Sequence, residues 1–188
     1  EVNGRPFFIW AQDATVLEGS LGVIHAKKIT SVMEKALQAQ VPIVGMVDSV
    51  GERAGDFIQY PHFYSLESMC QLQTMSSGVI PQIILVMGPC VGGMALSVSL
   101  ADFLFLVRKT SYMHVAPPPD GISPEELGEA WMHAKKTGCY DVFAENDIDC
   151  LQKCRRLLGY LPQSNREKPP FIETGDNPNR KEAELLEL

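Results

Sequence analysis

Two short stretches combine glycine with the end of an apolar segment, and both could do chemistry through the main chain. The first is "DSVGERAG", residues 48–55, after an apolar run that ends at Val47, and the second is "GPCVGG", residues 88–93, after a run that ends at Met87. Where a strand passes into a helix, the first N–H groups of the helix point outward and carry the positive end of its dipole. Two such donors from neighbouring loops could hold one oxygen atom that gains negative charge during a reaction, because glycine leaves the approach to the main chain open.

The same glycines could instead serve only tight turns and close packing of helices on a sheet, and the pattern alone leaves both interpretations open. Neither stretch ends in Gly-Lys-Ser/Thr or contains G-x-G-x-x-G, which argues against nucleotide binding by those motifs. Ser49 lacks the G-x-S-x-G surroundings of a hydrolase nucleophile. His62, His114 and His133 have no spacing to a carboxylate or a nucleophile that suggests a catalytic triad.

The composition indicates an ordinary globular domain with a sizeable core. The chain has 188 residues, of which 45% are hydrophobic and 21% charged. The formal net charge of -7 argues against nucleic acid or an anionic membrane as a partner. With no apolar run of transmembrane length, no secretory leader and no Asn-x-Ser/Thr acceptor, we expect an intracellular protein, of the mitochondrial matrix or the cytoplasm.

The cysteines predict neither a disulfide framework nor a metal site. Their number, five, is odd, and their spacing matches no zinc pattern. Cys150 and Cys154 are four residues apart and could share a helix face, where small apolar residues in a reducing compartment are the favoured interpretation.

Strands and helices are expected to alternate. Strands are predicted over residues 7–10, 41–49, 82–87, 103–110 and 111–116. Helices are predicted over residues 18–40, 61–78, 94–103, 123–136 and 148–161. Ser20 is the expected N-cap of the first helix and Gly78 the stop of the second, while Ser123, Pro124 and Glu126 form the start of the fourth.

The apolar strands are continuous rather than alternating, which is typical of parallel βαβ units buried on both faces. The composition changes at Pro162, where a stretch rich in proline, asparagine and charge begins. We therefore expect a domain over residues 1–161, incomplete at its N-terminus, and a linker or tail over residues 162–188 that leads towards a further domain.

The longest recognisable motifs lie in residues 3–29, 41–53, 76–113, 125–138 and 144–165, which include "VPIVGMVDSVGER" and "MGPCVGGMALS". With these motifs, most of the chain resembles one family, the carboxyltransferase (beta) subunits of biotin-dependent acyl-CoA carboxylases such as propionyl-CoA carboxylase. It implies an α/β fold of the crotonase type, a superhelix of repeated ββα units. It also implies transfer of a carboxyl group from N-carboxybiotin to the α-carbon of an acyl-CoA within an ATP-dependent holoenzyme.

The resemblance implies roles for particular residues. The family's "GPCAGG" falls on residues 88–93, so Gly92 and Gly93 would donate backbone N–H groups to the thioester oxygen, with Gly88 and Cys90 at the acyl-CoA. The family's "DSGGAR" falls on residues 48–53, so the second donor would be the N–H of Glu52 or Gly51. Lys27 and Arg53 are the expected anchors of the CoA phosphates, and no metal is expected.

The implied partners are an acyl-CoA, a biotin carboxylase and biotin carrier subunit, and further copies of the chain, as a dimer to a hexamer. In the family the site forms between this domain of one subunit and a second, biotin-binding domain of another. The chain alone would then be an acyl-CoA half-site without turnover.

The sequence departs from the family at several places near these loops. Val50 replaces a glycine, Glu52 replaces an alanine, and Met94 replaces a small residue, which would shrink the acyl pocket. A positive φ at position 50 would strain a β-branched residue. The segment 114–130 is also shorter than its counterpart in the family, which leaves the choice of acyl-CoA open.

Two alternatives therefore stand beside the carboxyltransferase. One is a biotin-independent crotonase-type decarboxylase or hydratase in which Glu52 or Asp56 is the acid or base. The other is a non-catalytic assembly domain that keeps only the fold.

Overall fold

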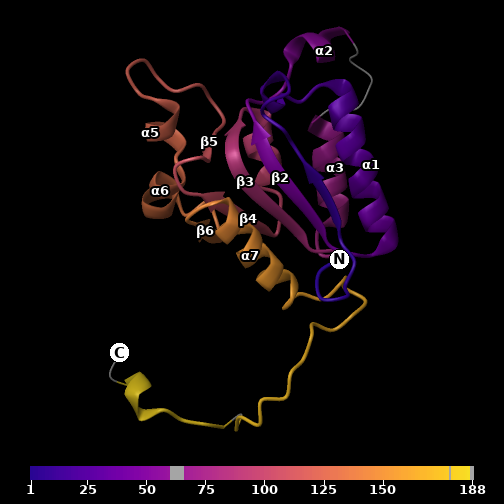
Figure 1. Ribbon diagram of the computed structural model, residues 1–188, viewed down its shortest axis with the longest axis vertical. Coiled ribbons are helices and arrows are strands. Elements are labelled where there is room, and N and C mark those ends of the chain that lie inside the picture. The colour runs from indigo at the N-terminus through magenta and orange to yellow at the C-terminus, as the bar shows by residue number, and fades with distance from the viewer. Residues whose placement is uncertain (60–65, 178, 187–188) are drawn as a thin grey trace.

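Six strands form one parallel sheet with helices on both faces, as Figure 1 shows for the computed structural model, which describes residues 1–59, 66–177 and 179–186. The strands are β1 (Phe8–Ala11), β2 (Ile43–Ser49), β3 (Gln82–Val91), β4 (Phe103–Val107), β5 (Tyr112–His114) and β6 (Val142–Ala144). Their order is β1-β2-β3-β4-β6, and β5 pairs with the last residues of β3. The predicted α/β class with parallel strands is confirmed.

Helical elements separate most of the strands, although β5 follows β4 directly. They are η1 (Leu17–Gly19), α1 (Val23–Ala39), α2 (Ala54–Gln59), α3 (Leu66–Ser76), α4 (Gly93–Val98), α5 (Pro124–Gly128), α6 (Ala130–Met132), η2 (His133–Thr137), α7 (Asp147–Leu158) and η3 (Ala183–Leu186). Figure 1 shows α1 and α3 against one face of the sheet and α7 against the other.

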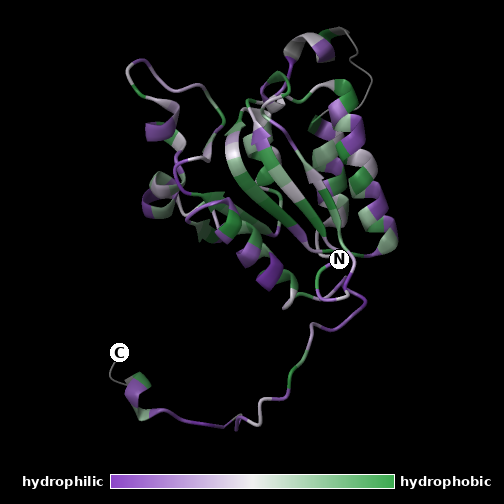
Figure 2. Ribbon diagram, viewed as in Figure 1, coloured by the Kyte–Doolittle hydropathy of each residue, from purple (hydrophilic) through white to green (hydrophobic). Residues whose placement is uncertain are grey.

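Both faces of the central strands are buried, which explains their continuous apolar sequence. On β2, Ile43 and Val47 pack into the cluster that contains α1 and α3, whereas Val44 packs into the cluster that contains Cys150 and Cys154 of α7. Figure 2 shows the same arrangement as apolar colour along the strands and polar colour on the outer faces of the helices. The two cysteines are therefore core residues, as their spacing suggested.

One strand extends well past its predicted end. The strand β2 ends at Ser49, as expected, whereas β3 runs to Val91 rather than Met87. The extension arises because Cys90 lies opposite Ser49 in the sheet and residues 89–91 pair with β5. The start of the second glycine stretch is thus strand and not loop. The sequence prediction also missed the short strand β6.

Helix boundaries differ from the prediction at Ser20 and after Gly128. Ser20 is not the N-cap of α1, because Gly22 takes that place, and the Ser20 hydroxyl donates to the Leu17 carbonyl instead. The helix at Ser123 has the predicted capping box, but it ends at Gly128, and the chain resumes as α6 and η2. The described part of α3 begins at Leu66, so residues 61–65 of that predicted helix lie outside the described residues.

The last part of the chain leaves the sheet (Figure 1). Ser164 is buried and the Asn165 N–H donates to the Val79 carbonyl, at 2.9 Å, whereas residues 166–177 are exposed. The expected boundary between residues 161 and 162 stays a prediction. Within the described part of the chain, no helix is long and apolar enough to cross a membrane.

Candidate functional site

The two glycine stretches meet at the carboxyl ends of neighbouring strands. We call residues 50–53 the β2 corner and residues 92–93 the β3 corner. Gly51 has a φ of 102° and lies so close to β3 that a Cβ atom on it would be 2.9 Å from the Val91 carbonyl oxygen. Gly92, the N-cap of α4, has a φ of 68°. Both positions need glycine, because L-residues are strained at these positive φ values.

Two of the expected backbone donors are already used inside the fold. The Gly92 N–H donates to the His114 carbonyl at 3.0 Å, and the Gly51 N–H donates to the Ser49 hydroxyl at 3.2 Å. These hydrogen bonds hold the corners in place. They also remove both N–H groups from the set that a ligand oxygen could use without a rearrangement.

The Gly93 N–H points at the Glu52 side chain. One Glu52 carboxylate oxygen accepts a hydrogen bond from this N–H at 3.3 Å. A Cβ atom on Gly93 would overlap the Glu52 carboxylate and a methyl group of Leu66, so the missing side chain leaves room for them. The Gly93 N–H is therefore the β3-corner donor that points away from the sheet, and its acceptor is the Glu52 carboxylate of the β2 corner.

The backbone of Glu52 is fixed by a single partner residue. The Leu21 N–H donates to the Gly51 carbonyl at 2.8 Å, and the Arg53 N–H donates to the Leu21 carbonyl at 2.9 Å. In such a parallel bridge the residue between the two bonded ones turns its own N–H to the opposite side. Among the described residues, the Glu52 N–H has no hydrogen-bond acceptor. It is the one β2-corner N–H without an acceptor in the part of the chain that the structure describes.

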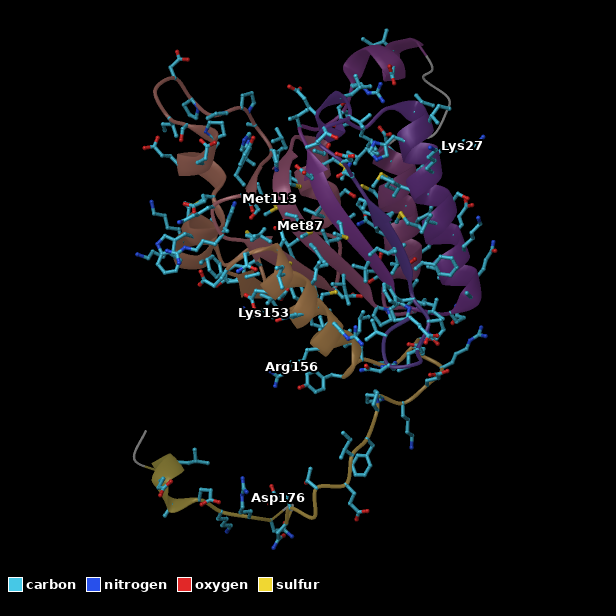
Figure 3. The ribbon with its side chains drawn as sticks, viewed as in Figure 1. Lys27, Met87, Met113, Lys153, Arg156 and Asp176 are labelled. Carbon is cyan, nitrogen blue, oxygen red and sulfur yellow. The ribbon has the colours of Figure 1, made fainter. Side chains whose placement is uncertain are left out.

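The two expected phosphate anchors lie near the first turn of α1. The Arg53 guanidinium contacts Gly22, the N-cap of that helix, and is 3.5 Å from the Asp56 carboxylate. Lys27 is exposed, and Figure 3 shows it projecting outward from α1. The helix has no acidic residue in its first turn and no side-chain cap, but the Asp56 carboxylate lies beside the Arg53 guanidinium at Gly22. Asp56, the alternative acid or base, is engaged by Arg53.

Gly88 and Cys90 have structural surroundings. A Cβ atom on Gly88 would overlap the carboxylate of Asp48, which lies beside it on β2. Burial raises the pKa of that carboxyl, against a hydrogen bond from the Ala14 N–H that lowers it. The Cys90 side chain is fully buried in the core, and burial raises the pKa of its thiol. The predicted contact of Cys90 with a ligand therefore does not involve its side chain.

The two hydrophobic departures from the family do not block the corners. Val50 is not among the residues with positive φ, so it does not carry the strain that a positive φ there would cause. Its side chain is 41% exposed. Met94 is fully buried in the core cluster that includes Leu21 and Met69, so it does not narrow a surface pocket as expected. Glu52 is the departure whose side chain reaches the β3 corner.

An apolar cavity of about 640 Å³ adjoins the β3 corner. Its walls are α4, β5, residues 115–119 and the segment from α5 to η2. It begins next to the corner, because Ala95 and Leu96 of α4 and His114 line it. His133 in its wall is held by the Met113 carbonyl at 2.9 Å and the Thr137 hydroxyl at 2.8 Å. The short segment 114–130 thus shapes the cavity.

No local pattern in the sequence predicts the cavity. Its wall joins residues from Ala95 to Cys139, which packing alone brings together. The sequence predicted the helices near it, over residues 94–103 and 123–136, but not the space between them.

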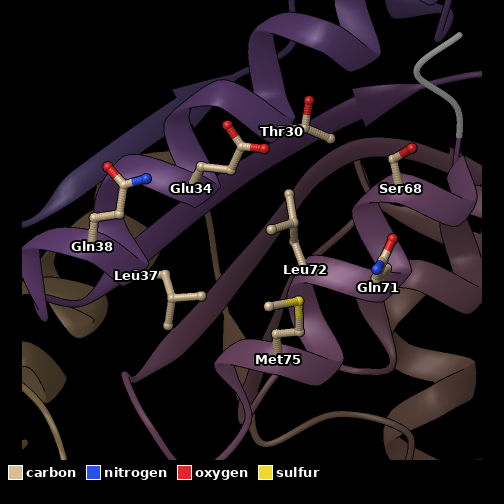
Figure 4. Close-up of a pocket in the computed structure, with 8 residues that line it drawn as sticks. All are labelled: Thr30, Glu34, Leu37, Gln38, Ser68, Gln71, Leu72 and Met75. Atoms are coloured by element: carbon tan, nitrogen blue, oxygen red, sulfur yellow. The ribbon is translucent and has the colours of Figure 1, made fainter.

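A second cavity, of about 530 Å³, lies between α1 and α3 (Figure 4). Thr30, Glu34 and Leu37 of α1 face Leu72 and Met75 of α3 across it. These α1 residues belong to later turns than Gly22, so the cavity is not part of the corners. Of residues 1–59, 66–177 and 179–186, no three or more His, Cys, Asp or Glu gather as they would around a metal ion.

Comparison with known proteins gives the family. The model of the carboxyl transferase domain matches residues 1–188. The chain belongs to the carboxyl transferase domain family. Its resemblance to the acyl-CoA carboxyltransferase subunits, inferred from the two glycine stretches and their surroundings, is confirmed.

Curated members of the carboxyl transferase domain family match almost the whole chain. The propionyl-CoA carboxylase beta chain of Roseobacter denitrificans is 40% identical over 191 residues, covering 98% of this chain and 37% of the relative. The methylmalonyl-CoA decarboxylase subunit alpha of Veillonella parvula is 39% identical, covering 100% and 38%. The mitochondrial propionyl-CoA carboxylase beta chain of Homo sapiens is 37% identical, covering 98% and 35%. The chain thus spans little more than a third of the length of these relatives.

Solved structures confirm the crotonase-type fold. A transcarboxylase 12S structure with methylmalonyl-coenzyme A and methylmalonic acid bound superposes with a TM-score of 0.84 and 33% identity, covering 90% of this chain and 34% of that one. The beta subunit of geranyl-CoA carboxylase from P. aeruginosa has a TM-score of 0.77 and 28% identity, covering 86% and 32%.

Proposed function

We propose that this domain is the acyl-CoA-binding half of a carboxyltransferase, which moves CO₂ from carboxybiotin to the α-carbon of propionyl-CoA or a similar acyl-CoA. The observation that supports the proposal is the meeting of two glycine corners on adjacent parallel strands. It gains weight because family members are named for propionyl-CoA and methylmalonyl-CoA, and a related solved structure holds methylmalonyl-coenzyme A.

The chemistry follows from the thioester. Loss of the α-proton from an acyl-CoA gives an enolate, whose oxygen gains negative charge. Backbone donors fixed beforehand stabilise that charge without reorganising, and losing one typically costs about 2.7–4 kcal/mol of barrier stabilisation. The Gly93 N–H and the Glu52 N–H are the donors we assign, because Gly92 and Gly51 use theirs within the fold.

The other parts of the site bind rather than react. Lys27 and Arg53, near the first turn of α1, would hold the CoA phosphates. The apolar cavity beside α4 suits the acyl group. Carboxybiotin supplies the carboxyl group as a substrate on a partner.

The partners belong to the same proposal. They are a biotin carboxylase and biotin carrier subunit, together with further copies of the protein, from a dimer to a hexamer. The transcarboxylase 12S structure, described as a hexamer assembly, supports the oligomer. An intracellular location, in the mitochondrial matrix or the cytoplasm, fits relatives of both mitochondrial and bacterial origin.

The decisive experiment is a size series at Gly93 in the whole protein with its partners. Gly93→Ala and then Gly93→Val place growing side chains over the assigned donor, while the colliding groups are flexible side-chain ends and the fold can survive. Carboxyl transfer to propionyl-CoA should fall by about 10²–10³-fold for the valine variant, with unchanged thermal unfolding. Full transfer by a folded Gly93→Val protein would refute the assigned role.

One observation favours a second candidate, a biotin-independent acyl-CoA decarboxylase or hydratase. The Glu52 carboxylate lies at the β3 corner, where an acid or base would act on a bound thioester. Turnover of an acyl-CoA without any carboxybiotin, and its loss in Glu52→Gln, would select this candidate. If the whole protein binds no CoA ester, a non-catalytic assembly domain would be the remaining candidate.

A further inference from the structure

We propose that the Glu52 carboxylate accepts the Gly93 N–H hydrogen bond in the free protein. An acyl-CoA must then displace this carboxylate before its thioester oxygen can accept from the same N–H. This inference rests on the proposed function and adds a competitor for the donor that the substrate would use. The competitor is Glu52, at the position where the family motif carries alanine.

The contact joins the two corners directly. The carboxylate oxygen is 3.3 Å from the Gly93 nitrogen, and the same oxygen would lie 3.3 Å from a Cβ atom on Gly92. The other carboxylate oxygen and a Leu66 methyl group occupy the space that a Cβ atom on Gly93 would take. The carboxylate thus covers the bare backbone of both glycines. A negatively charged oxygen sits where the proposed mechanism develops one on the substrate.

The Glu52 carboxylate can move away from Gly93 while the backbone of the β2 corner stays folded. The backbone on either side of Glu52 is held through Leu21, so the side chain can rotate while the main chain stays in place. Glu52 is exposed, and within the described part of the chain its carboxylate has no ion pair. The nearby Arg53 is paired with Asp56. A thioester therefore competes with one hydrogen bond in water-exposed surroundings.

The test compares ligands with and without an acyl oxygen. Binding of propionyl-CoA and of free CoA is measured by calorimetry for the whole protein as the wild type, Glu52→Ala and Glu52→Gln. Glu34→Ala is the matched control, since it removes an exposed glutamate from a later turn of α1. Hydrogen exchange of the Gly93 amide is measured in the same proteins without ligand.

Glu52→Ala should bind propionyl-CoA about three- to tenfold more tightly, the factor that corresponds to one net hydrogen bond, with free CoA and the Glu34→Ala control unchanged. Its Gly93 amide should exchange faster until propionyl-CoA is added. Glu52→Gln keeps the size and reach of the side chain but not its charge, so its affinity for propionyl-CoA should rise less than that of Glu52→Ala. It also keeps the test possible if the alanine variant does not fold.

The outcomes are distinct. Equal or weaker binding of propionyl-CoA by both Glu52 variants would overturn the inference and leave the proposed function standing. An equal gain for free CoA would also overturn it, because the effect would not depend on the acyl oxygen. Absence of propionyl-CoA binding in every protein would remove the proposed function, and the inference with it.

Discussion

Replacing Gly19 with alanine should destabilise the domain far more than replacing Gly4, although both glycines have positive φ. The φ angles are 64° and 75°, so each alanine pays a similar conformational cost of about 1–2 kcal/mol. The surroundings differ. A Cβ atom on Gly4 has nothing within 4 Å, whereas one on Gly19 would overlap the Asp48 carbonyl oxygen and lie 3.3 Å from the Ser49 Cα atom.

The extra cost at Gly19 follows from what it would strike. The obstacle is the backbone of β2, which cannot rotate aside as a side chain can. Either η1 or the end of β2 must move, and overpacking of this kind typically costs about 1–3 kcal/mol. Adding the conformational term gives roughly 2–5 kcal/mol, a large part of the ~5–15 kcal/mol that usually stabilises a domain.

Urea unfolding followed by far-UV circular dichroism measures the difference. The Gly19→Ala chain should have a clearly lower midpoint than the Gly4→Ala chain, with a similar slope. Midpoints that agree within the error would refute the claim that Gly19 is packed against the end of β2. The placement of the β2 corner would then need revision too, since Val50 donates to the carbonyl of the neighbouring Glu18.

Two further predictions concern ionisable groups. Asp48→Asn should stabilise the protein at neutral pH. Burial raises the pKa of the folded carboxyl, so its contribution to the free energy of unfolding falls as pH rises above the ordinary pKa of 3.8. The stabilisation by asparagine should vanish below that pH, and an equal stabilisation at all pH values would contradict burial as its cause. A thiol reagent should label exposed Cys139 first in the native protein, while Cys150 and Cys154, whose pKa values burial raises to about 12 and about 11, react only on unfolding; mass spectrometry of early-labelled Cys150 would count against their burial.

Local signals predicted elements well where a few consecutive residues decide the structure. The capping box at Ser123 involves only Glu126 and its neighbours, and it is present as expected. The end of the same helix was not predictable. Gly128 is packed against the backbone of Met113, and Glu129 bridges to Tyr112, so contacts with β5 break the helix. The same holds for the start of α1, where pairing of Leu21 with the β2 corner moves the cap to Gly22.

The sequence by itself determined the alternation of buried strands and helices and the two positions where bare backbone meets a strand end. These follow from hydrophobic periodicity and from glycine, which act over a few residues. Only the tertiary structure decided which N–H groups remain for a ligand. The His114 carbonyl accepts from the Gly92 N–H, the Ser49 hydroxyl from the Gly51 N–H, and the Glu52 carboxylate from the Gly93 N–H. Except for Ser49, these acceptors come from other parts of the chain, and packing of the strands, not local preference, brings them to the glycines.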